Sequence, residues 1–318
     1  MTGAVRAMDG FAVEQLSPDF GFYVRTTAVL AEARSPLQHI EVVQTPLFGR
    51  ALRIDGCFMT SEGDEFFYHE PMVHLPAIAH GDVRQALVVG GGDGGAAHHL
   101  LRYAGMERVV LAELDRAVID MARQWLPAVH HGAFDDARLA LHLGDGRAFV
   151  EACEQQFDQI VLDLTDPAGP ALALYTRQFY RACRRALKPG SVLSLHIQSP
   201  IHRGEAMARI VASLASEFAI VRPYLQYVPL YGTLWGMAMA SDSVDPLLLP
   251  AAEVDARLTR HGVRDLKLYD GATHHALLTL PPFVRAQLAQ GVAPIDDGNR
   301  LGDMPQVRPH ALAAPVSL

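Results

Sequence analysis

Apolar strand-like runs alternate with helical segments through the middle of the chain. The runs lie at residues 86–90, 109–114, 139–145, 159–164, 191–197 and 235–241. Between them, segments such as AVIDMARQWL (117–126) carry apolar residues every three or four positions, as an amphipathic helix does. Strands that alternate with helices predict a parallel sheet covered on both faces. We therefore expect an α/β fold with a Rossmann-like, doubly wound sheet.

The segment before this domain has a different pattern. Residues 20–60 hold short β-like stretches separated by turn signals, which predict a small antiparallel sheet. The apolar spacing of DEFFYHEPMVHLPAIAH (64–80) is helical. We expect an N-terminal β domain over residues 19–75, the Rossmann-like domain over 76–290, and flexible ends at 1–18 and 291–318.

The charge balance excludes some classes of partner. The chain has 27 Lys and Arg against 35 Asp and Glu, a formal net charge of −8, and its only lysines are Lys188 and Lys267. A nucleic-acid partner needs a basic face, so this composition argues against one and favours a small cationic ligand. No apolar run is long enough to predict a membrane partner, and Cys57, Cys153 and Cys183 lack disulfide or zinc spacing. We expect a cytoplasmic protein that holds no metal.

A glycine-rich loop, GGGDGG (90–95), lies between the first of these strands and the next helix. Doubly wound folds bind nucleotide-like ligands at this point, and Gly90, Gly92 and Gly95 satisfy the dinucleotide pattern G-x-G-x-x-G. A dinucleotide enzyme is therefore one interpretation. However, Asp93 within the loop would repel a pyrophosphate and attract a cation. Asp93 could instead serve only as a helix cap.

Two further acidic residues follow the next two strands. Glu113 is placed to bind both hydroxyls of a ribose, and Asp145 to accept a hydrogen bond from the amine of an adenine. Each could also be a turn residue at a strand end. The order of glycine loop, Glu113 and Asp145 repeats the layout of S-adenosylmethionine methyltransferases, which predicts a nucleoside without phosphate.

The fourth strand ends in LDLTDPAGP, which places Asp163 and Asp166 at the same edge. Pro167 and Pro170 stiffen this loop. Asp166 could be a structural turn residue, whereas Asp163 emerges from an apolar strand. A carboxylate buried beside others either binds a cation or takes up a proton, and both behaviours suit a base that acts on an amine.

With these residues in view, the sequence resembles the polyamine aminopropyltransferases, the spermidine synthase family. The resemblance runs from about residue 35 to 285 and rests on these segments: SPLQHIEVVQTPLFGRALRIDG, GDEFFYHEPMVH, LVVGGGDGGAAHHLL, VVLAELDRAVIDMARQWLP, GDGRAFV, LDLTDPAGPALALYTRQFY and YDGATHHALLTLPPF. It implies a small N-terminal β domain, a Rossmann-like catalytic domain, and a homodimer or homotetramer. It also implies transfer of the aminopropyl group of decarboxylated S-adenosylmethionine to a polyamine amine, with release of methylthioadenosine. The decarboxylated compound is a co-substrate, and no permanently bound cofactor is implied.

The resemblance also implies roles for individual residues. The nucleoside would be held by Gln38, Glu113, Asp145 and Gly146 above the glycine loop, and the ammonium of the aminopropyl group by Asp93. Asp163 would be the base, with Tyr68 beside the reacting amine as a second part of the proton sink. The acceptor side would include Asp166, Tyr231, His69 and, near them, Asp64. His69 has an equally good interpretation as a helix surface residue.

The chain departs from the usual family pattern on the acceptor side. Where many members have Gln-Cys-Glu-Ser-Pro, it has HIQSP (196–200), so His196 and Gln198 would contact the acceptor, and Leu172 replaces a common glutamate. DLTDP, ALYT and MASDSVDP look more like the thermospermine-type branch, whose acceptors include longer amines. Putrescine, giving spermidine, is therefore the default acceptor only.

Three other functions remain as alternatives. An S-adenosylmethionine-dependent N-methyltransferase would be stabilised by the intact compound rather than by the decarboxylated one. A catalytically silent polyamine-binding homologue would lack turnover. The retained Asp163, Asp166 and Tyr68 argue against this alternative, because a silent protein would not need them. A nicotinamide-dependent oxidoreductase ranks last, because nothing in the sequence resembles a hydride-transfer site.

Overall fold

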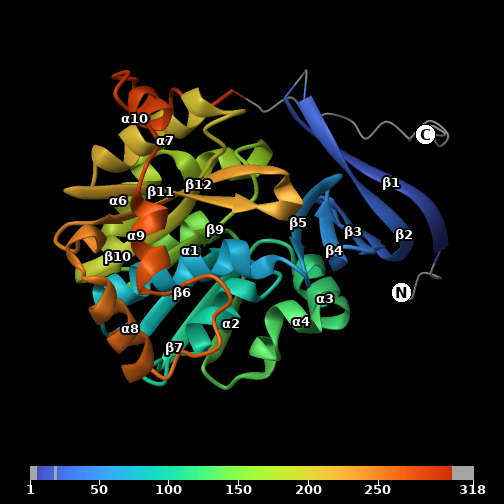
Figure 1. Ribbon diagram of the computed structural model, residues 1–318, viewed down its shortest axis with the longest axis horizontal. Helices are drawn as coiled ribbons and strands as arrows, with labels where there is room; N and C mark the ends of the chain where they lie inside the picture. Colours follow the sequence, from blue (N-terminus) through green and yellow to red (C-terminus); the bar gives the residue numbers. More distant parts are fainter. Residues whose placement is uncertain (1–5, 18–19, 303–318) are drawn as a thin grey trace.

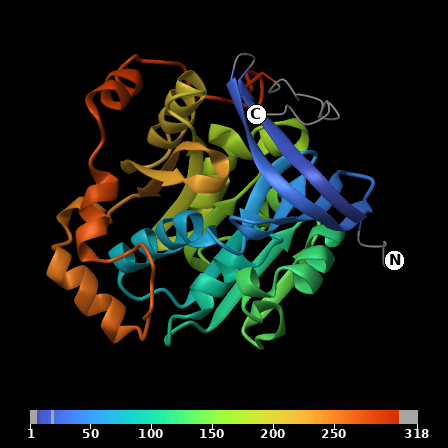
Figure 2. The same ribbon diagram turned by 45° about the vertical axis from the view of Figure 1, so that its right-hand side comes forward.

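The structure, a computed structural model, describes residues 6–17 and 20–302 and contains two sheets (Figure 1). The N-terminal sheet is antiparallel, as predicted, with its strands in chain order: β1 (Arg6–Ser17), β2 (Phe20–Arg34), β3 (His39–Thr45), β4 (Gly49–Ile54) and β5 (Cys57–Ser61). The long hairpin of β1 and β2 projects beyond the other three strands (Figure 2).

The central sheet has the strand order β11-β12-β10-β9-β6-β7-β8. Its strands are β6 (Gln85–Gly90), β7 (Arg108–Glu113), β8 (Leu139–Leu143), β9 (Phe157–Asp163), β10 (Leu187–Gln198), β11 (Ile220–Val228) and β12 (Thr233–Ser241). The five strands from β10 to β8 in this order are parallel, which confirms the Rossmann-like α/β fold. A wholly parallel sheet was the wrong prediction, because β11 and β12 are antiparallel. The connection between them, residues 229–232, is far shorter than the dozen or so residues that a parallel crossover needs.

Helices cover both faces of the central sheet, and each face has its own core. One core includes side chains of α1 (Glu65–His80), α2 (Gly95–Leu101), α3 (Arg116–Trp125), α4 (Pro127–His130), α8 (Ala251–Arg260) and α9 (Gly271–Leu278). The other includes side chains of α5 (Gly146–Glu151), α6 (Arg177–Ala186), α7 (Gly204–Ala215) and α10 (Pro282–Leu288). Adjacent residues of β6 point to opposite cores, Val88 to the first and Leu87 and Val89 to the second. The expected double layer of helices is confirmed.

The domain limits differ from those expected. The predicted boundary at 75/76 falls inside α1, whose Met72 and Leu75 are buried in the core that also holds Val88. Part of the N-terminal segment predicted to be flexible is strand β1, because β2 supplies its backbone partners from Arg6↔Val29 to Ser17↔Phe20. Residues 1–5 and 18 of that segment, and residues 303–318 of the C-terminal one, lie outside the described residues.

The start of the predicted C-terminal tail is packed against the Rossmann-like domain. Ile295 is fully buried, its backbone N–H donates to Ser213 Oγ at 2.7 Å, and its carbonyl accepts from the Arg177 N–H at 2.9 Å. Arg147 donates to both carboxylate oxygens of Asp297 at 2.8 Å. The prediction of flexibility from residue 291 is therefore wrong for this part, because one buried apolar side chain and specific hydrogen bonds fix it.

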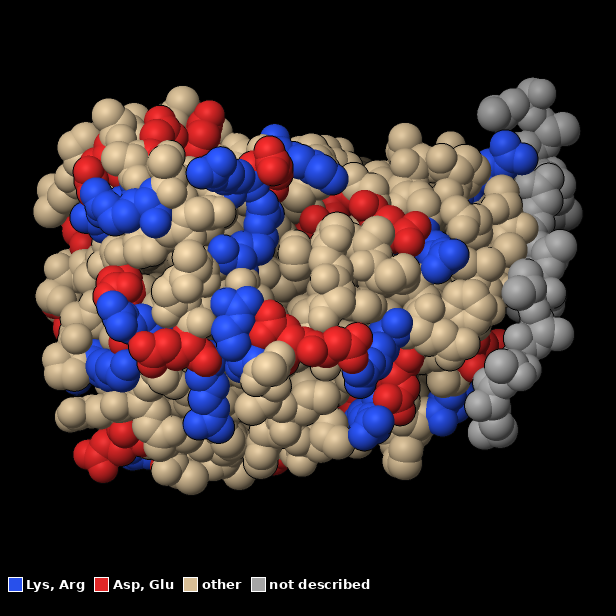
Figure 3. Space-filling view, turned by 90° about the horizontal axis from the view of Figure 1, so that it is seen from below, with Lys and Arg blue, Asp and Glu red and all other residues tan. Residues whose placement is uncertain are grey.

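The surface carries mixed charge. On the face shown in Figure 3, blue basic residues and red acidic residues are interspersed, and neither sign forms a continuous patch there. Within residues 6–17 and 20–302, no helix is long and apolar enough to cross a bilayer.

Candidate active site

The glycine loop connects β6 to α2 and packs against the end of β9. Gly90 has a φ of 77°, in the left-handed region, and a Cβ there would lie 2.3 Å from the Asp163 carbonyl oxygen. The Gly91 N–H donates to this same oxygen at 2.8 Å. These contacts place Asp93, which follows in the loop, near Asp163 at the carboxyl edge of the sheet.

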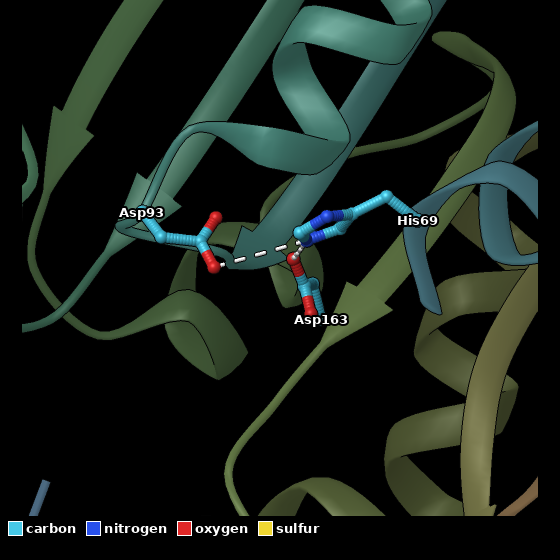
Figure 4. A group of neighbouring side chains, drawn as sticks. All are labelled: His69, Asp93 and Asp163. Atoms are coloured by element: carbon cyan, nitrogen blue, oxygen red, sulfur yellow. Dashed lines mark ion pairs between the residues drawn. The ribbon is translucent and has the colours of Figure 1, made fainter. Parts of the chain in front are cut away.

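His69, Asp93 and Asp163 come from three elements and face one another (Figure 4). His69 Nε2 lies 3.8 Å from Asp93 Oδ2 and 3.8 Å from Asp163 Oδ2, and His69 Nδ1 lies 2.9 Å from Glu65 Oε2. Burial alone would lower the pKa of His69, but Asp93, Glu65 and Asp163 together raise it to about 9. The His69 side chain is 1% exposed, so it is not the helix surface residue of the alternative interpretation.

Asp163 is a buried carboxylate with one free oxygen. Its Oδ2 atom has no hydrogen-bond partner among the described residues. Burial first, and then the neighbouring Asp93, raise the pKa of Asp163 to about 6, while His69 and then a hydrogen bond from Tyr68 act in the opposite direction. Asp93 precedes the N-cap residue of α2, Gly94, and its Oδ1 accepts from the first backbone N–H of this helix, that of Gly95, at 2.8 Å, whereas its Oδ2 is the atom that faces His69.

The predicted nucleoside residues lie around the ends of β7 and β8. Glu113 Oε1 accepts from the Asp115 N–H at 2.8 Å, and Asp115 Oδ2 accepts from Gln38 Nε2 at 3.0 Å. Gln38, from the N-terminal domain, is thus brought close to Glu113, and a Cβ at Gly92 would lie 2.9 Å from Glu113 Oε2. Burial raises the pKa of Glu113 to about 7.

Asp145 lies after β8, as predicted, and it is also the N-cap residue of α5. Its Oδ1 caps α5 by accepting from the backbone N–H groups of Arg147 and Ala148 at 2.8 and 3.3 Å, and Gly146 behind it is buried. The Gly144 N–H donates to the Glu113 carbonyl at 3.0 Å, which holds this turn against the end of β7. Asp145 and Glu113 therefore lie at adjacent strand ends.

A narrow cavity of about 40 Å³ is lined by residues of β1, β5, α1, the loop after β9, β10 and the start of β12. Its lining includes Tyr68, Tyr231, His196 and Asp166, as well as Leu16, Cys57, Phe58, Met59, Leu164, Thr165, Trp235 and Glu14. Asp166 Oδ1 accepts from Gln198 Nε2 at 2.9 Å, which orients the carboxylate. Of the predicted acceptor residues, Asp166, Tyr231 and His196 line this cavity, and Gln198 contacts Asp166, whereas His69 and Asp64 are not in its lining.

Tyr68 and Tyr231 form part of the cavity wall. Their ring centroids are 6.0 Å apart, and the Tyr231 hydroxyl donates to the Met59 carbonyl at 2.6 Å. Burial, followed by the charge of Asp163, raises the pKa of Tyr68 well above its ordinary value. The Tyr68 phenol therefore keeps its proton at neutral pH and is a hydrogen-bond donor.

Asp64 supports the wall from behind. Ser61 Oγ donates to Asp64 Oδ1 at 2.5 Å, and the Leu230 N–H donates to Asp64 Oδ2 at 2.7 Å. Both oxygens are used, and Asp64 is 3% exposed. The contacts of Asp64 fix the segment that carries Tyr231.

Sequence reasoning missed Glu14, which reaches the cavity from β1. Glu14 Oε2 accepts from the Phe58 N–H at 2.7 Å, and burial raises the pKa of Glu14 to about 8, with a further contribution from Asp166. The available signal was the short apolar run FAV (11–13) directly before Glu14, which lay in the segment predicted to be flexible.

The described residues contain one group of side chains with the spacing of metal ligands, namely His69, Asp93 and Asp163. The ligand atoms of these three residues all lie within 4.8 Å of one another. A protonated imidazole has no free nitrogen for coordination, so the raised pKa of His69 favours a proton over a metal at this position.

Comparisons with known proteins identify the family of the chain. The spermine/spermidine synthase domain model matches residues 65–247, and the spermidine synthase tetramerisation domain model matches residues 11–62. The chain is 76% identical over 296 residues to the polyamine aminopropyltransferase of Nitrosomonas europaea, a match that covers 93% of this chain and 91% of the relative. It is 39% identical over 264 residues to polyamine aminopropyltransferase 2 of Hyperthermus butylicus, with coverage of 82% and 87%.

Solved structures show the same fold. A spermidine synthase in complex with the transition state analogue AdoDATO superimposes with a TM-score of 0.83 at 31% identity, covering 89% of this chain and 96% of that one. The spermidine synthase of Thermotoga maritima has a TM-score of 0.81 at 30% identity, with coverage of 89% and 95%. Both the sequence motifs and the fold place the chain in the spermine/spermidine synthase family.

Proposed function

We propose that the chain transfers the aminopropyl group of decarboxylated S-adenosylmethionine to an amine nitrogen of a polyamine, and that Asp163 accepts the proton. The observation that carries the assignment of Asp163 is its buried Oδ2 atom, which has no hydrogen-bond partner among the described residues. Asp163 is the last residue of β9, and Leu164, which follows it, lines the narrow cavity. The names of the relatives, polyamine aminopropyltransferases, support the reaction.

The bond changes need no electrophilic assistance. The amine lone pair attacks the carbon next to the sulfonium, the new N–C bond forms, and the C–S electron pair leaves on sulfur as neutral methylthioadenosine. The amine must first be neutral, although such amines titrate near the lysine value of about 10. Asp163, with a pKa of about 6, is ionised at neutral pH and can take the proton.

On the nucleoside side, the proposed contacts are Gln38, Glu113, Asp145 and Gly146, with Gly90, Gly92 and Gly95 beneath them. Asp93 would bind the ammonium of the aminopropyl group through its Oδ2, since Oδ1 accepts from the Gly95 N–H. An anionic site would disfavour the carboxylate of intact S-adenosylmethionine and thus select the decarboxylated compound.

On the acceptor side, the narrow cavity suits an unbranched aliphatic amine. Asp166, held by Gln198, would bind the amine chain, while Tyr68, Tyr231 and His196 line its path and His69 faces the reacting end. Because the Tyr68 phenol keeps its own proton, it would orient the amine by donating, and Asp163 would be the proton acceptor. Asp64 would act indirectly, through Tyr231. Putrescine stays the default acceptor, and the thermospermine-type features stay a prediction.

Replacement of Asp163 by Asn tests the proposal. Asp163→Asn keeps the shape but cannot accept a proton, so we expect turnover to fall at least about 100-fold while the Kd for decarboxylated S-adenosylmethionine changes little. Product masses would be measured with putrescine, cadaverine, agmatine, norspermidine and spermidine.

Three outcomes would contradict the proposal. Undiminished turnover of Asp163→Asn rejects Asp163 as the base. Methylated amines formed from intact S-adenosylmethionine would favour the methyltransferase. Absence of turnover by the unaltered protein with every amine would favour the silent homologue.

We also infer a cytoplasmic homo-oligomer, a dimer or tetramer. The match of the tetramerisation domain to residues 11–62 supports assembly, and β1 and β2 expose Phe11 and Tyr23 on the projecting hairpin. All three cysteines are free, as in a reducing compartment.

A further inference from the structure

A chain of buried polar side chains leads away from the proposed active site between α1 and α2. Glu65 Oε2 contacts His69 Nδ1 at 2.9 Å and His99 Nε2 at 3.2 Å. His99 Nδ1 lies 2.9 Å from His74 Nε2, and His74 Nδ1 lies 2.9 Å from the Tyr103 hydroxyl. The four residues behind His69 are all at most 7% exposed. These residues are therefore too buried to contact a substrate. Burial of polar groups also costs free energy that apolar side chains in the same places would not cost.

The directions of these hydrogen bonds are fixed by chemistry. Hydrogen bonds from His69 and His99 oppose the effect of burial and lower the pKa of Glu65, so it is an anion that can only accept. His99 must therefore donate from Nε2. Burial lowers the pKa values of His99 and His74, so both are neutral and each has one acceptor nitrogen.

The remaining bonds follow from this first one. His99 accepts at Nδ1 from His74 Nε2–H, and His74 accepts at Nδ1 from the Tyr103 hydroxyl, whose pKa burial raises. Every donor in the chain thus points toward Glu65. A proton leaving the active site would meet hydrogens that already point inward, so the arrangement is suited to holding Glu65 in one state rather than to conducting protons out.

We propose that His99 is a positioning residue for the proposed reaction: backed by His74 and Tyr103, it pins the Glu65 carboxylate, which holds His69 as an imidazolium facing Asp93 and Asp163. This inference rests on the proposed function for its catalytic meaning. Without the donor of His99, Glu65 would be a buried carboxylate whose one remaining side-chain hydrogen-bond partner among the described residues is His69, and the proton would shift from His69 to Glu65.

The consequence for the base is electrostatic. The groups that face His69 are Glu65 and Tyr68 on α1, Asp93 in the glycine loop, His99 on α2 and Asp163 at the end of β9. Among them the imidazolium is the one cation, and it opposes the rise in the pKa of Asp163 that burial and Asp93 cause. A neutral His69 would let the pKa of Asp163 rise further, and the base would be protonated over more of the neutral pH range.

The test compares His99→Leu with the matched control His98→Leu. His98 is the adjacent residue on α2, and its ring contacts that of His131 in a tilted arrangement, with 4.4 Å between centroids. Nitrogen-15 NMR of histidine-labelled free protein, with the His69 signals assigned from His69→Gln, would follow the protonation of the His69 ring. We expect His99→Leu to lower the pKa of His69 by about one unit or more, a tenfold change in its acid dissociation constant, and His98→Leu to leave it unchanged.

The second readout is the pH profile of kcat/KM. Because the base must be ionised, kcat/KM falls as pH decreases through the pKa of Asp163, at about 6 in the unaltered chain. In His99→Leu this acidic limb should move to higher pH, and in His99→Gln, which restores an N–H donor, it should move back toward its original position. A purely structural role would lower thermal stability and leave both titrations where they are.

Either of two results overturns the proposal: a His69 ring in His99→Leu that titrates as in His98→Leu, or an acidic limb that does not move. The NMR measurement needs no turnover. A shifted His69 pKa in a protein that transfers no aminopropyl group would therefore reject the proposed function and keep the positioning role of His99.

Discussion

The position of His69 depends on the absence of a side chain at residue 95. A Cβ built on Gly95 would lie 2.2 Å from His69 Cε1 and 2.6 Å from both ring nitrogens. Real Cβ atoms do not approach this closely, so the first residue of α2 must be glycine for the imidazole to lie between Asp93 and Asp163. The dinucleotide-like glycine pattern thus has a different physical use here, which is to admit a histidine ring.

Gly95→Ala should displace the His69 ring and reduce kcat/KM at least about tenfold, through the loss of contacts made near the reacting atoms. Gly105→Ala is the matched control, because the nearest atom to a Cβ there, Asp82 Oδ1, is 3.7 Å away. Steady-state kinetics of both variants would check this. A Gly95→Ala protein with unaltered kcat/KM would show that the ring tolerates the shift.

At the scale of elements, α1 is a helix buried along most of its length, so its polar residues need internal partners. Glu65 and His69 are used in the active site, and Glu70 is used for structure. Its two carboxylate oxygens accept from three backbone N–H groups, those of Lys267, Leu268 and Tyr269, at 2.8, 2.8 and 2.9 Å. One helix therefore places the site residues and anchors a segment almost two hundred residues further along the chain.

Glu70→Gln replaces one acceptor oxygen by an amide donor that faces backbone donors. We expect the free energy of unfolding to fall by roughly 1–3 kcal/mol, the usual cost of an unsatisfied buried polar group. Chemical denaturation would measure it, with exposed Glu154→Gln as the control. Equal stabilities of the two variants would mean that the 267–269 segment is held by other contacts.

At the scale of the whole molecule, the C-terminal segment ties distant parts together. Arg147, which follows the Asp145 turn, donates to Asp297 and to the Ala173 carbonyl, and Arg209 of α7 donates to the Ala293 and Asn299 carbonyls. Ile295 is the buried apolar contact among these polar ones. The segment therefore links the nucleoside side, the loop after β9 and α7.

Ile295→Ala should lower the free energy of unfolding by about 2–5 kcal/mol, because it removes buried methyl groups and leaves a cavity. Ile201→Ala, at a residue that is 60% exposed, should change it by no more than about 0.5 kcal/mol. Thermal or denaturant unfolding would compare the two. A small effect of Ile295→Ala would mean that the packing of Ile295 does not stabilise the protein, and it would support the flexibility predicted from the sequence.

The parts of the site that follow from strand ends were predictable. Glu113 and Asp163 are the last residues of strands β7 and β9, and Asp93 lies in the loop after β6. Because parallel strands end at a common edge, position along the chain was enough. The contacts of His99 were not predictable, because they depend on how α1 and α2 pack, and a histidine pair on a helix has no sequence pattern that distinguishes a partner from a surface residue.

Two strands, β11 and β1, were not predicted from the sequence, for local reasons. β11 contains Pro223, which usually argues against a strand, but β11 is at the sheet edge and pairs only with β12 among the described strands. β1 is long and exposes Phe11 and Val13, so its alternation did not resemble a half-buried strand. Glu14 was missed with it.

The reversed direction of β12 has a consequence for the shape of the catalytic edge. Its first residues, not its last, lie beside the end of β10, as the pairing of Gln198 with Gly236 shows. Tyr231 and Trp235, whose ring centroids are 5.0 Å apart, therefore arrive where the parallel strands finish. Had this strand run parallel to β10, Tyr231 and Trp235 would lie at the opposite edge of the sheet, and the narrow cavity would lose the part of its wall that they form.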